Sequence, residues 1–277
     1  MEPGEIAAAI GVELVGRLPH GEGSGAYEIR TAGGDRAVLK LYAGDVLDLG
    51  APPDLVDALR ARGYPAPATR SKGALDGTVY EIQEYLRGDP MEELTPALLP
   101  QVLALNGRQR DVGLIGRGPW IHEMVTSVLE GRTGYCEHAA MASHSNETQA
   151  LLDLLLRIAD GARGLQVSDS DVVHFDFSPY NVLTAGDRIT GVVDWDGATN
   201  GDAAFDLVTL ASYTYDYPTR DALLAAAAER TDPDALALYA AHMVLRQVDW
   251  TIRHHEELEV QWFIGIGTDL LTAVGAH

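Results

Sequence analysis

Alternating hydrophobic and polar positions in the first third of the chain predict a series of short β-strands. Two of these strands are separated by Ala32-Gly33-Gly34-Asp35, a glycine-rich segment that is typical of a hairpin turn. One segment instead has helical spacing, with Leu55, Val56 and Leu59 on one side. The expected strands cover 12–18, 26–31, 36–42, 68–72 and 78–85, and the expected helix covers 54–63.

Helical spacing dominates after Arg87-Gly88-Asp89-Pro90, and a region of short strands at 172–202 interrupts it. We therefore expect an α+β protein with two lobes. Residues 1–86 form a small β-rich N-terminal lobe that ends in a hinge near 83–88, and 87–277 form a larger, mainly helical C-terminal lobe. The expected helices cover 95–105, 120–130, 147–165, 206–213, 220–230, 233–255 and 260–274.

The charge of the chain narrows its possible partners. Among its 277 residues, 20 are Lys or Arg and 41 are Asp or Glu, which gives a formal charge of −21. Such an acidic chain is not expected to bind nucleic acid or an anionic membrane surface as a partner, because both attract basic proteins. It suits a small cationic molecule, although an acidic surface also simply keeps a protein in solution.

The single cysteine, Cys136, excludes an intramolecular disulfide and a cysteine-rich zinc site. The N-terminus lacks the basic and apolar segments of a signal peptide, and no apolar run approaches the length of a membrane span. We expect a cytoplasmic protein that is a monomer or a weak dimer.

The segment Val172–Leu183 carries the most specific chemistry, because two apolar stretches flank a polar loop with the pattern H-x-D-x-x-x-x-N. In such a loop Asp176 can orient a hydroxyl nucleophile while the amide oxygen of Asn181 binds Mg²⁺. Asp194 follows the apolar pair Val192-Val193 and would be a second oxygen ligand of the metal. Alternatively, these residues only form turns. His174 is expected to hold the loop rather than to react.

The first lobe offers matching features for a nucleotide. A glycine-rich turn at 16–25, which includes Gly23, Ser24 and Gly25, can bring backbone N–H groups close to phosphates. Lys40 lies inside an apolar strand, where it either reaches solvent or meets an anion, and we favour contact with the α- and β-phosphates. At the hinge, the carbonyl of Glu84 and the N–H of Leu86 can bind a purine.

The order of these motifs resembles the protein-kinase-like fold and, within it, the aminoglycoside phosphotransferase family. The resemblance rests on His174-Phe175-Asp176 to Asn181, on Val193-Asp194-Trp195-Asp196 and on Gly201–Leu207, which is similar to the G-D-P-x-x-D-L helix start of that family. It implies an enzyme that transfers the γ-phosphoryl group of ATP or GTP to a hydroxyl. It also implies roles for individual residues: Asp176 as base, Asn181 and Asp194 as Mg²⁺ ligands, Lys40 on the phosphates, and Asp202 and Asp206 as structural support.

Three features depart from the family pattern. Phe175 stands where the family usually has Gly, which should alter the packing of the loop. No αC-helix glutamate is evident as a partner for Lys40, since only Asp54 and Asp57 lie near its place. Finally, residues 195–205 are too few for the activation segment of a protein kinase, and D-F-G and A-P-E are missing. The last feature favours a small-molecule acceptor.

The acidic and aromatic residues of the helical lobe suit a cationic antibiotic, either an aminoglycoside or a basic cyclic peptide of the viomycin or capreomycin type, and the activity would then confer resistance. Candidate substrate ligands are Asp196, Asp216, Glu256 and Glu257, each of which can also be an ordinary solvated residue. Two alternatives remain: a metabolite kinase of the same fold, acting on choline, homoserine or an amino sugar, and a pseudokinase that only binds nucleotide.

Overall fold

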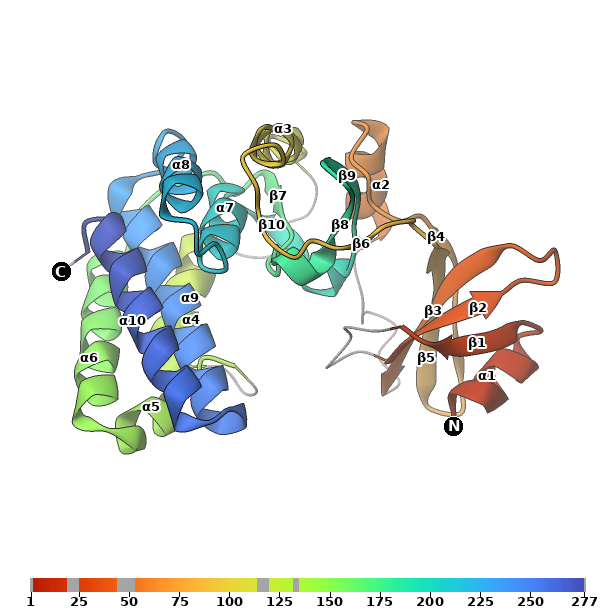
Figure 1. The fold of residues 1–277 in the computed structure, drawn as a ribbon, viewed down its shortest axis with the longest axis horizontal. Helices are drawn as coiled ribbons and strands as arrows, with labels where there is room; N and C mark the ends of the chain where they lie inside the picture. The colour runs from red at the N-terminus through yellow and green to blue at the C-terminus, as the bar shows by residue number, and fades with distance from the viewer. Residues whose placement is uncertain (1, 19–24, 44–52, 114–119, 132–134, 277) are drawn as a thin grey trace. The chain divides into compact units, whose positions relative to one another are not determined.

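The computed structural model describes residues 2–18, 25–43, 53–113, 120–131 and 135–276. These residues form two compact units (Figure 1). The first unit comprises 1–92 and 180–197, and the second comprises 93–179 and 198–277.

The first unit is built on an antiparallel sheet of five strands in the order β1-β2-β3-β5-β4 (Figure 1). Its strands occur close to where the alternating pattern predicts them. They are β1 (Glu13–Arg17), β2 (Gly25–Arg30), β3 (Arg36–Ala43), β4 (Thr69–Leu75) and β5 (Thr78–Glu84).

One face of this sheet forms the core of the first unit. Helix α1 (Pro3–Ala9) buries Ala7 against Ile29 of β2 and Leu39 of β3. Since side chains alternate between the two faces of a strand, the neighbours of Leu39 on β3 point to the opposite face. Lys40 belongs to that second face, and it stands directly across from Glu81 of β5.

A second small sheet belongs to the same unit, in the order β6-β8-β9. It consists of β6 (Asp89–Pro90), β8 (Val182–Ala185) and β9 (Arg188–Val192). The N–H of Val192 also donates to the carbonyl of Pro65, at 2.8 Å, just after helix α2 (Pro53–Ala61). These bonds attach the hairpin to the first unit, although it lies far along the chain.

The second unit is mostly helical, with one short strand pair, β7 (Asp171–Val173) and β10 (Thr199–Gly201). The long helix α9 (Pro233–His254) contacts α4, α5, α6, α7 and α10 and buries most of its residues. It is therefore the central helix of this unit. The other helices are α3 (Leu99–Arg108), α4 (Trp120–Glu130), α5 (His138–His144), α6 (Asn146–Gly161), α7 (Ala204–Ala211), α8 (Tyr217–Ala228) and α10 (Glu257–Ala273).

The α+β class, with a β-rich N-terminal part and a mainly helical C-terminal part, is confirmed. Helix α3 begins at Leu99 rather than at Thr95, because proline is tolerated only in the first turn and Pro100 must lie there. Helix α6 ends at Gly161, short of the predicted 165. Helices α1 and α5 were not predicted. Among the helices that the structure describes, none has both the length and the apolar character needed to cross a bilayer.

Candidate active site

Lys40 lies among carboxylates on the face of the sheet away from α1, and it is only 3% exposed. Its Nζ is 2.5 Å from Oδ1 of Asp194 and 2.6 Å from Oδ2 of Asp196. Burial lowers the pKa of Lys40, but the charges of these two carboxylates outweigh burial and raise it. Lys40 is therefore held as a buried cation, and its partners come from the segment after β9.

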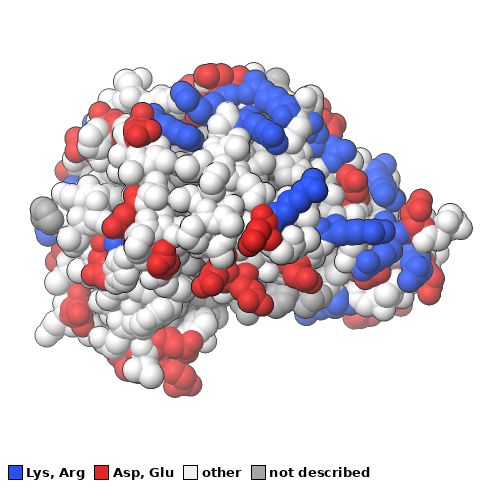
Figure 2. Space-filling view, turned by 45° about the horizontal axis from the view of Figure 1, so that its top comes forward, with Lys and Arg blue, Asp and Glu red and all other residues white. Residues whose placement is uncertain are grey.

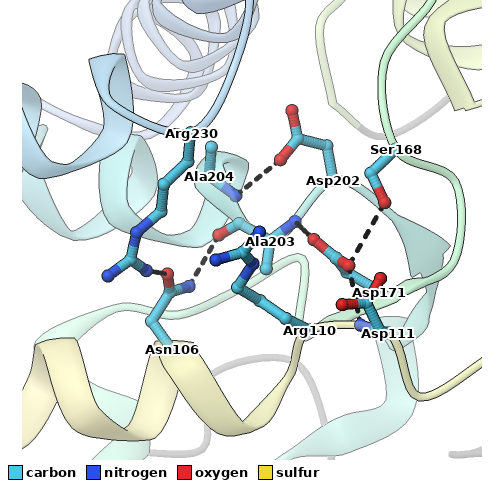
Figure 3. A pocket seen from close by; sticks show the side chains of 9 residues that line it. All are labelled: Asn106, Arg110, Asp111, Ser168, Asp171, Asp202, Ala203, Ala204 and Arg230. Atoms are coloured by element: carbon cyan, nitrogen blue, oxygen red, sulfur yellow. Dashed lines mark hydrogen bonds between the residues drawn. The ribbon is translucent and has the colours of Figure 1, made fainter.

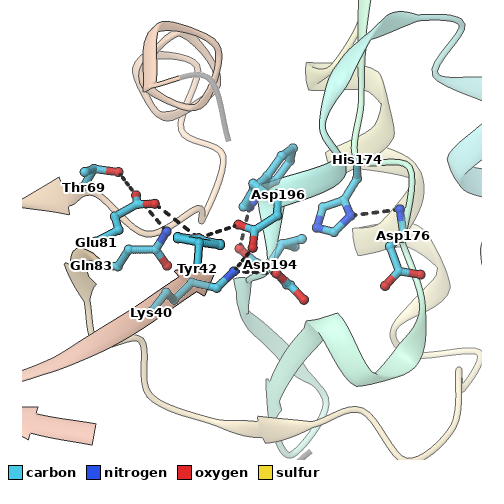
Figure 4. Close-up of polar contacts among 11 residues, drawn as sticks. Lys40, Tyr42, Thr69, Glu81, Gln83, His174, Asp176, Asp194 and Asp196 are labelled. Atoms are coloured by element: carbon cyan, nitrogen blue, oxygen red, sulfur yellow. Dashed lines mark hydrogen bonds and ion pairs between the residues drawn. The ribbon is translucent and has the colours of Figure 1, made fainter. Parts of the chain in front are cut away.

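Further polar side chains extend this group across the sheet (Figure 4). The hydroxyl of Tyr42 donates to Oδ1 of Asp196 at 3.0 Å and lies 3.4 Å from Oε2 of Glu81. Glu81 also accepts hydrogen bonds from Thr69 at 2.6 Å and from Gln83 at 3.0 Å. Burial and the charge of Asp196 raise the pKa of Tyr42, so this phenol stays neutral. No sequence motif singles out Tyr42 or Glu81, although strand alternation places both on the face of Lys40.

Asn181 and Asp194 lie at the same end of the β8–β9 hairpin. Val182 pairs with Val192, and one residue farther along the N–H of Val193 donates to the carbonyl of Asn181 at 2.9 Å. Asp194 has φ +63°, a left-handed conformation that non-glycine residues seldom adopt outside special sites. The hairpin thus brings together the two predicted metal ligands.

The donor set at this end of the hairpin fits Mg²⁺. The side chains of Asn181 and Asp194 carry the hard oxygen ligands that Mg²⁺ prefers, and Lys40 donates a hydrogen bond to Oδ1 of Asp194. Among the described residues, no three His, Cys, Asp or Glu side chains gather as a metal-binding group. A site with two protein ligands therefore suits a cation whose other ligands are phosphate oxygens and water.

Trp195 fixes the position of the two aspartates on either side of it in the chain. Its side chain is buried, its Nε1 donates to the carbonyl of Val192 at 2.9 Å, and its ring packs edge-on against Tyr64 at a centroid distance of 5.3 Å. The anchored indole makes this turn rigid, which presents Asp194 and Asp196 to Lys40.

The predicted nucleotide residues at the hinge are placed as follows. The carboxylate of Glu84 accepts hydrogen bonds from Arg60 at 3.0 Å and from the N–H of Ala68 at 3.2 Å. Leu86 lies against Gly191, where an added Cβ would come within 2.8 Å of the leucine side chain. Purine binding by the backbone of Glu84 and Leu86 stays a prediction.

Of the predicted phosphate loop, Gly25 is the first residue of β2, while Gly23 and Ser24 lie outside the described residues.

The loop with the H-x-D-x-x-x-x-N pattern begins in the second unit. The side chain of Asp176 is 36% exposed, and its Oδ1 accepts a hydrogen bond from Arg246 at 2.8 Å. Buried His174 accepts the N–H of Asp176 on its Nδ1 at 3.3 Å (Figure 4), which fits the holding role expected for this histidine. Phe175, between them, has φ +73°.

Two buried aspartates lie at the start of α7, and one of them contacts this loop. Asp206 of α7 accepts the N–H groups of His174 at 2.8 Å and of Phe175 at 3.1 Å, together with the side chain of Gln109. Asp202 accepts the N–H of Ala204 at 2.9 Å, at the start of α7. Burial raises the pKa of both carboxyl groups. These contacts fit the supporting roles that the resemblance implies.

Each of the predicted substrate ligands has its own contacts. Asp216 caps α8 by accepting the N–H of Thr219 at 3.1 Å, and Glu256 is part of the capping box of α10. Glu257 lies 3.3 Å from Nε2 of His144. Asp196 belongs to the Lys40 group. Their role in binding a substrate stays a prediction.

A pocket of about 90 Å³ lies elsewhere in the second unit, beside the start of α7 (Figure 3). Its walls are tied together by internal hydrogen bonds, such as that from the N–H of Ala203 to Asp171 at 3.1 Å. Two arginines, Arg110 and Arg230, line the pocket. Burial lowers the pKa of Arg230, and the nearby charge of Arg110 lowers it further. The pocket contains none of the residues predicted to hold nucleotide or metal.

Comparison with known proteins decides the family. Residues 15–241 match the model of the phosphotransferase enzyme family, APH. The chain belongs to this family. The match includes Lys40, Asp176, Asn181 and Asp194. Among curated protein sequences, none matches the chain.

Solved structures agree with this assignment. A thermostable mutant of aminoglycoside phosphotransferase APH(4)-Ia, in a ternary complex with ADP and hygromycin B, matches with a TM-score of 0.70 at 19% identity and covers 97% of both chains. Amicoumacin kinase hAmiN, in complex with AMP-PNP, Ca²⁺ and Ami, has a TM-score of 0.63 at 13% identity and covers 98% of this chain and 94% of its own. Choline kinase LicA from Streptococcus pneumoniae has a TM-score of 0.60 at 15% identity, with coverages of 99% and 97%. The predicted kinase-like fold is thus confirmed.

Proposed function

We propose that this phosphotransferase transfers the γ-phosphoryl group of ATP or GTP to a hydroxyl of a cationic antibiotic, an aminoglycoside or a basic cyclic peptide, and thereby confers resistance. The observation that carries the proposal is the buried Lys40, whose Nζ lies 2.5 Å from Asp194 at the end of the hairpin that also carries Asn181. A magnesium–triphosphate complex requires a cation near its phosphates and an oxygen ligand for the metal. A buried lysine beside a carboxylate supplies both groups.

The first unit supplies the groups that suit the triphosphate. Lys40 is kept charged by Asp194 and Asp196. In the nucleotide complex its ammonium group would also contact the α- and β-phosphates. Asn181 and Asp194 would hold Mg²⁺ between them and the phosphates. The bound Mg²⁺ supplies charge neutralisation on the phosphate oxygens.

The second unit supplies the carboxylate that suits the acceptor. Asp176 would accept the proton of the attacking hydroxyl while the oxygen–phosphorus bond forms and the nucleoside diphosphate leaves. The hydrogen bonds of Asp206 and His174 to the loop hold this carboxylate in place. Phosphoryl transfer depends mainly on such positioning, since it needs little covalent chemistry from the protein.

The acidic character of the chain supports a cationic acceptor. At a formal charge of −21, the protein attracts cations by long-range electrostatics. One similar structure is a complex with hygromycin B and another is a choline kinase; these small molecules belong to those proteins, and they favour a small molecule as the substrate class here.

A metabolite kinase is the second candidate, and one observation favours it. The rings of Tyr215 and Trp262 lie 4.7 Å apart, and each residue is 48% exposed. An exposed aromatic pair can bind a quaternary ammonium group through cation–π contacts. This pair would suit choline, while an aminoglycoside would use carboxylates instead.

A transfer assay with a panel of acceptors tests the proposal. The purified chain is incubated with Mg²⁺ and either γ-labelled ATP or GTP, together with aminoglycosides, viomycin-type peptides, choline, homoserine and amino sugars, and labelled products are separated. We expect a phosphorylated cationic antibiotic. A product only from choline or another metabolite would favour the second candidate. Nucleotide binding without any phosphorylated product would indicate a pseudokinase and overturn both.

A further inference from the structure

A line of polar side chains runs along one side of the central helix α9. Tyr239, His242, Arg246 and Asp249 recur at spacings of three and four residues, which places them on one helical face. They contact several parts of the second unit. Tyr239 donates to Asp202 at 2.9 Å, His242 packs on Phe175 at a centroid distance of 5.6 Å, and Asp249 accepts the N–H of Glu137 at 3.0 Å.

Arg246, in the middle of this line, holds the Asp176 loop at two points. Its Nη1 donates to the carbonyl of Phe175 at 3.1 Å, and its Nη2 donates to Oδ1 of Asp176 at 2.8 Å. The left-handed conformation of Phe175 sets the direction in which the chain leaves that residue. One guanidinium therefore fixes both the backbone of the loop and the carboxylate that it carries.

The surroundings of Arg246 make this contact strong and well defined. Its guanidinium lies 5.9 Å from the ring centroids of both Tyr135 and Phe175, and its side chain is 23% exposed. Aromatic rings limit the positions that the guanidinium can take and reduce the screening of its charge by water. The planar guanidinium then restricts rotation of the Asp176 side chain.

From this geometry we infer that Arg246 is a positioning residue for phosphoryl transfer. It holds Oδ1 of Asp176 so that the acceptor hydroxyl is oriented by Oδ2. The inference rests on the proposed function, because it assigns Asp176 to the acceptor. In the reaction the hydroxyl proton moves to Oδ2, the acceptor oxygen bonds to the γ-phosphorus, and the bond from phosphorus to the bridging oxygen breaks to release the nucleoside diphosphate.

Steady-state kinetics of the full-length enzyme with Arg246→Met and Arg246→Lys test this inference, using the best acceptor from the panel. Positioning errors of about 1 Å can cost on the order of 100-fold in rate. We expect Arg246→Met to lower kcat by about 10- to 100-fold, with the KM for ATP changed by less than about threefold. Arg246→Lys, or added methylguanidinium with Arg246→Met, should restore part of kcat.

Arg253→Met is a matched control, since it removes the other arginine–aspartate pair of α9, whose Nη2–Oδ2 distance is 2.9 Å, away from the Asp176 loop. It should lower the thermal midpoint and leave kcat unchanged. An equal loss of kcat in Arg253→Met, or a wild-type kcat in Arg246→Met, would overturn the inference while the proposed function stands. If the wild-type enzyme transfers phosphate to no acceptor, the proposed function itself fails, and the inference fails with it.

Discussion

At the scale of single residues, two unusual backbone conformations flank the candidate chemistry. Phe175 has φ +73° and Asp194 has φ +63°. Such conformations cost on the order of 1 kcal/mol or more and persist only where surrounding contacts enforce them. At Phe175 the enforcing contacts are aromatic, since its ring stacks on Phe205 at 5.4 Å and meets Trp120 edge-on at 6.3 Å.

Substitution of Phe175 separates the backbone strain from the packing of its ring. Phe175→Ala should lower the free energy of unfolding by about 2–4 kcal/mol through lost packing. Phe175→Gly should be more stable than Phe175→Ala by about 1 kcal/mol, because glycine accepts positive φ without strain. Denaturant unfolding measures both. At Phe205, which lies in a helix, the Ala variant should instead be more stable than the Gly variant. If the Gly variant were the more stable one at both sites, backbone strain at Phe175 would be excluded as the cause.

Lys40 makes the second prediction at this scale. Lys40→Met should reduce turnover by about 100-fold, because it removes a preorganised positive charge from the phosphates and leaves Asp194 and Asp196 facing each other. Steady-state kinetics and nucleotide titration measure the effect. Arg36→Met, which removes a cation from the same strand, is the control. Similar activity in Lys40→Met and Arg36→Met would exclude a phosphate contact for Lys40.

The sequence singles out individual candidate residues more readily than the partners that those residues contact in the fold. Lys40 was recognised because a lysine inside an apolar strand is costly without an anion. Its partners, Asp194 and Asp196, could not be inferred, since they lie more than 150 positions away, as the separation of 154 between Lys40 and Asp194 shows. Arg246 was missed for the same reason: nothing local in the sequence of a helix indicates which loop its arginine contacts.

At the scale of elements, α7 connects the helical core to the Asp176 loop through Asp206. This carboxyl group is fully buried and accepts hydrogen bonds from two loop N–H groups. Helices and strands were predicted close to their observed positions where the apolar stripe or the strand alternation was long. Boundaries failed where a single residue decides them, as Pro100 does for α3. Helix α5, with seven residues, is too short to give a clear periodic signal.

The raised pKa of Asp206 predicts how pH changes stability. Burial raises this pKa above the usual value of 3.8. As pH falls through the raised pKa toward 3.8, the folded state binds a proton that the unfolded state does not. The contribution of Asp206 to stability therefore rises on acidification in this window.

Urea unfolding of the wild type and of Asp206→Asn over a pH series measures this contribution. The wild type should gain stability relative to Asp206→Asn as pH falls in the window. Asp160→Asn, at an exposed residue, is the control for the loss of one carboxylate. A difference between wild type and Asp206→Asn that stays constant with pH would contradict the prediction.

At the scale of the whole molecule, the excess of acidic residues is spread rather than gathered on the face drawn in Figure 2. Asp and Glu side chains form small separate groups there, while Lys and Arg side chains gather along the upper edge and toward the right-hand end. The formal charge of −21 gives the protein a summed field that attracts cations and that salt screens.

This field predicts a difference between acceptors. For a cationic acceptor, kcat/KM should fall severalfold as ionic strength rises from about 10 mM to about 150 mM, over which the screening length shortens markedly. For an uncharged analogue with the same reacting hydroxyl, it should stay nearly constant. Measuring both with saturating MgATP cancels the effect of salt on the nucleotide. Equal salt dependence for the two acceptors would exclude electrostatic attraction of the acceptor.

The division into units could be predicted only in part. Composition indicates a change near 87–90, and the first of the two segments of the first unit ends at 92. The inclusion of 180–197 in the first unit depends on the pairing of β6 with β8, which brings together strands far apart in the chain. Pairing over such a distance leaves no local pattern in a single sequence.

We propose that Asp176 activates a small-molecule hydroxyl toward a magnesium-bound nucleoside triphosphate. Single-turnover phosphoryl transfer by wild type and Asp176→Ala, with enzyme in excess over labelled ATP and the acceptor saturating, tests it most directly. We expect Asp176→Ala to bind ATP with unchanged affinity and to transfer phosphate at least about 100-fold more slowly. A transfer rate equal to that of the wild type would contradict the account.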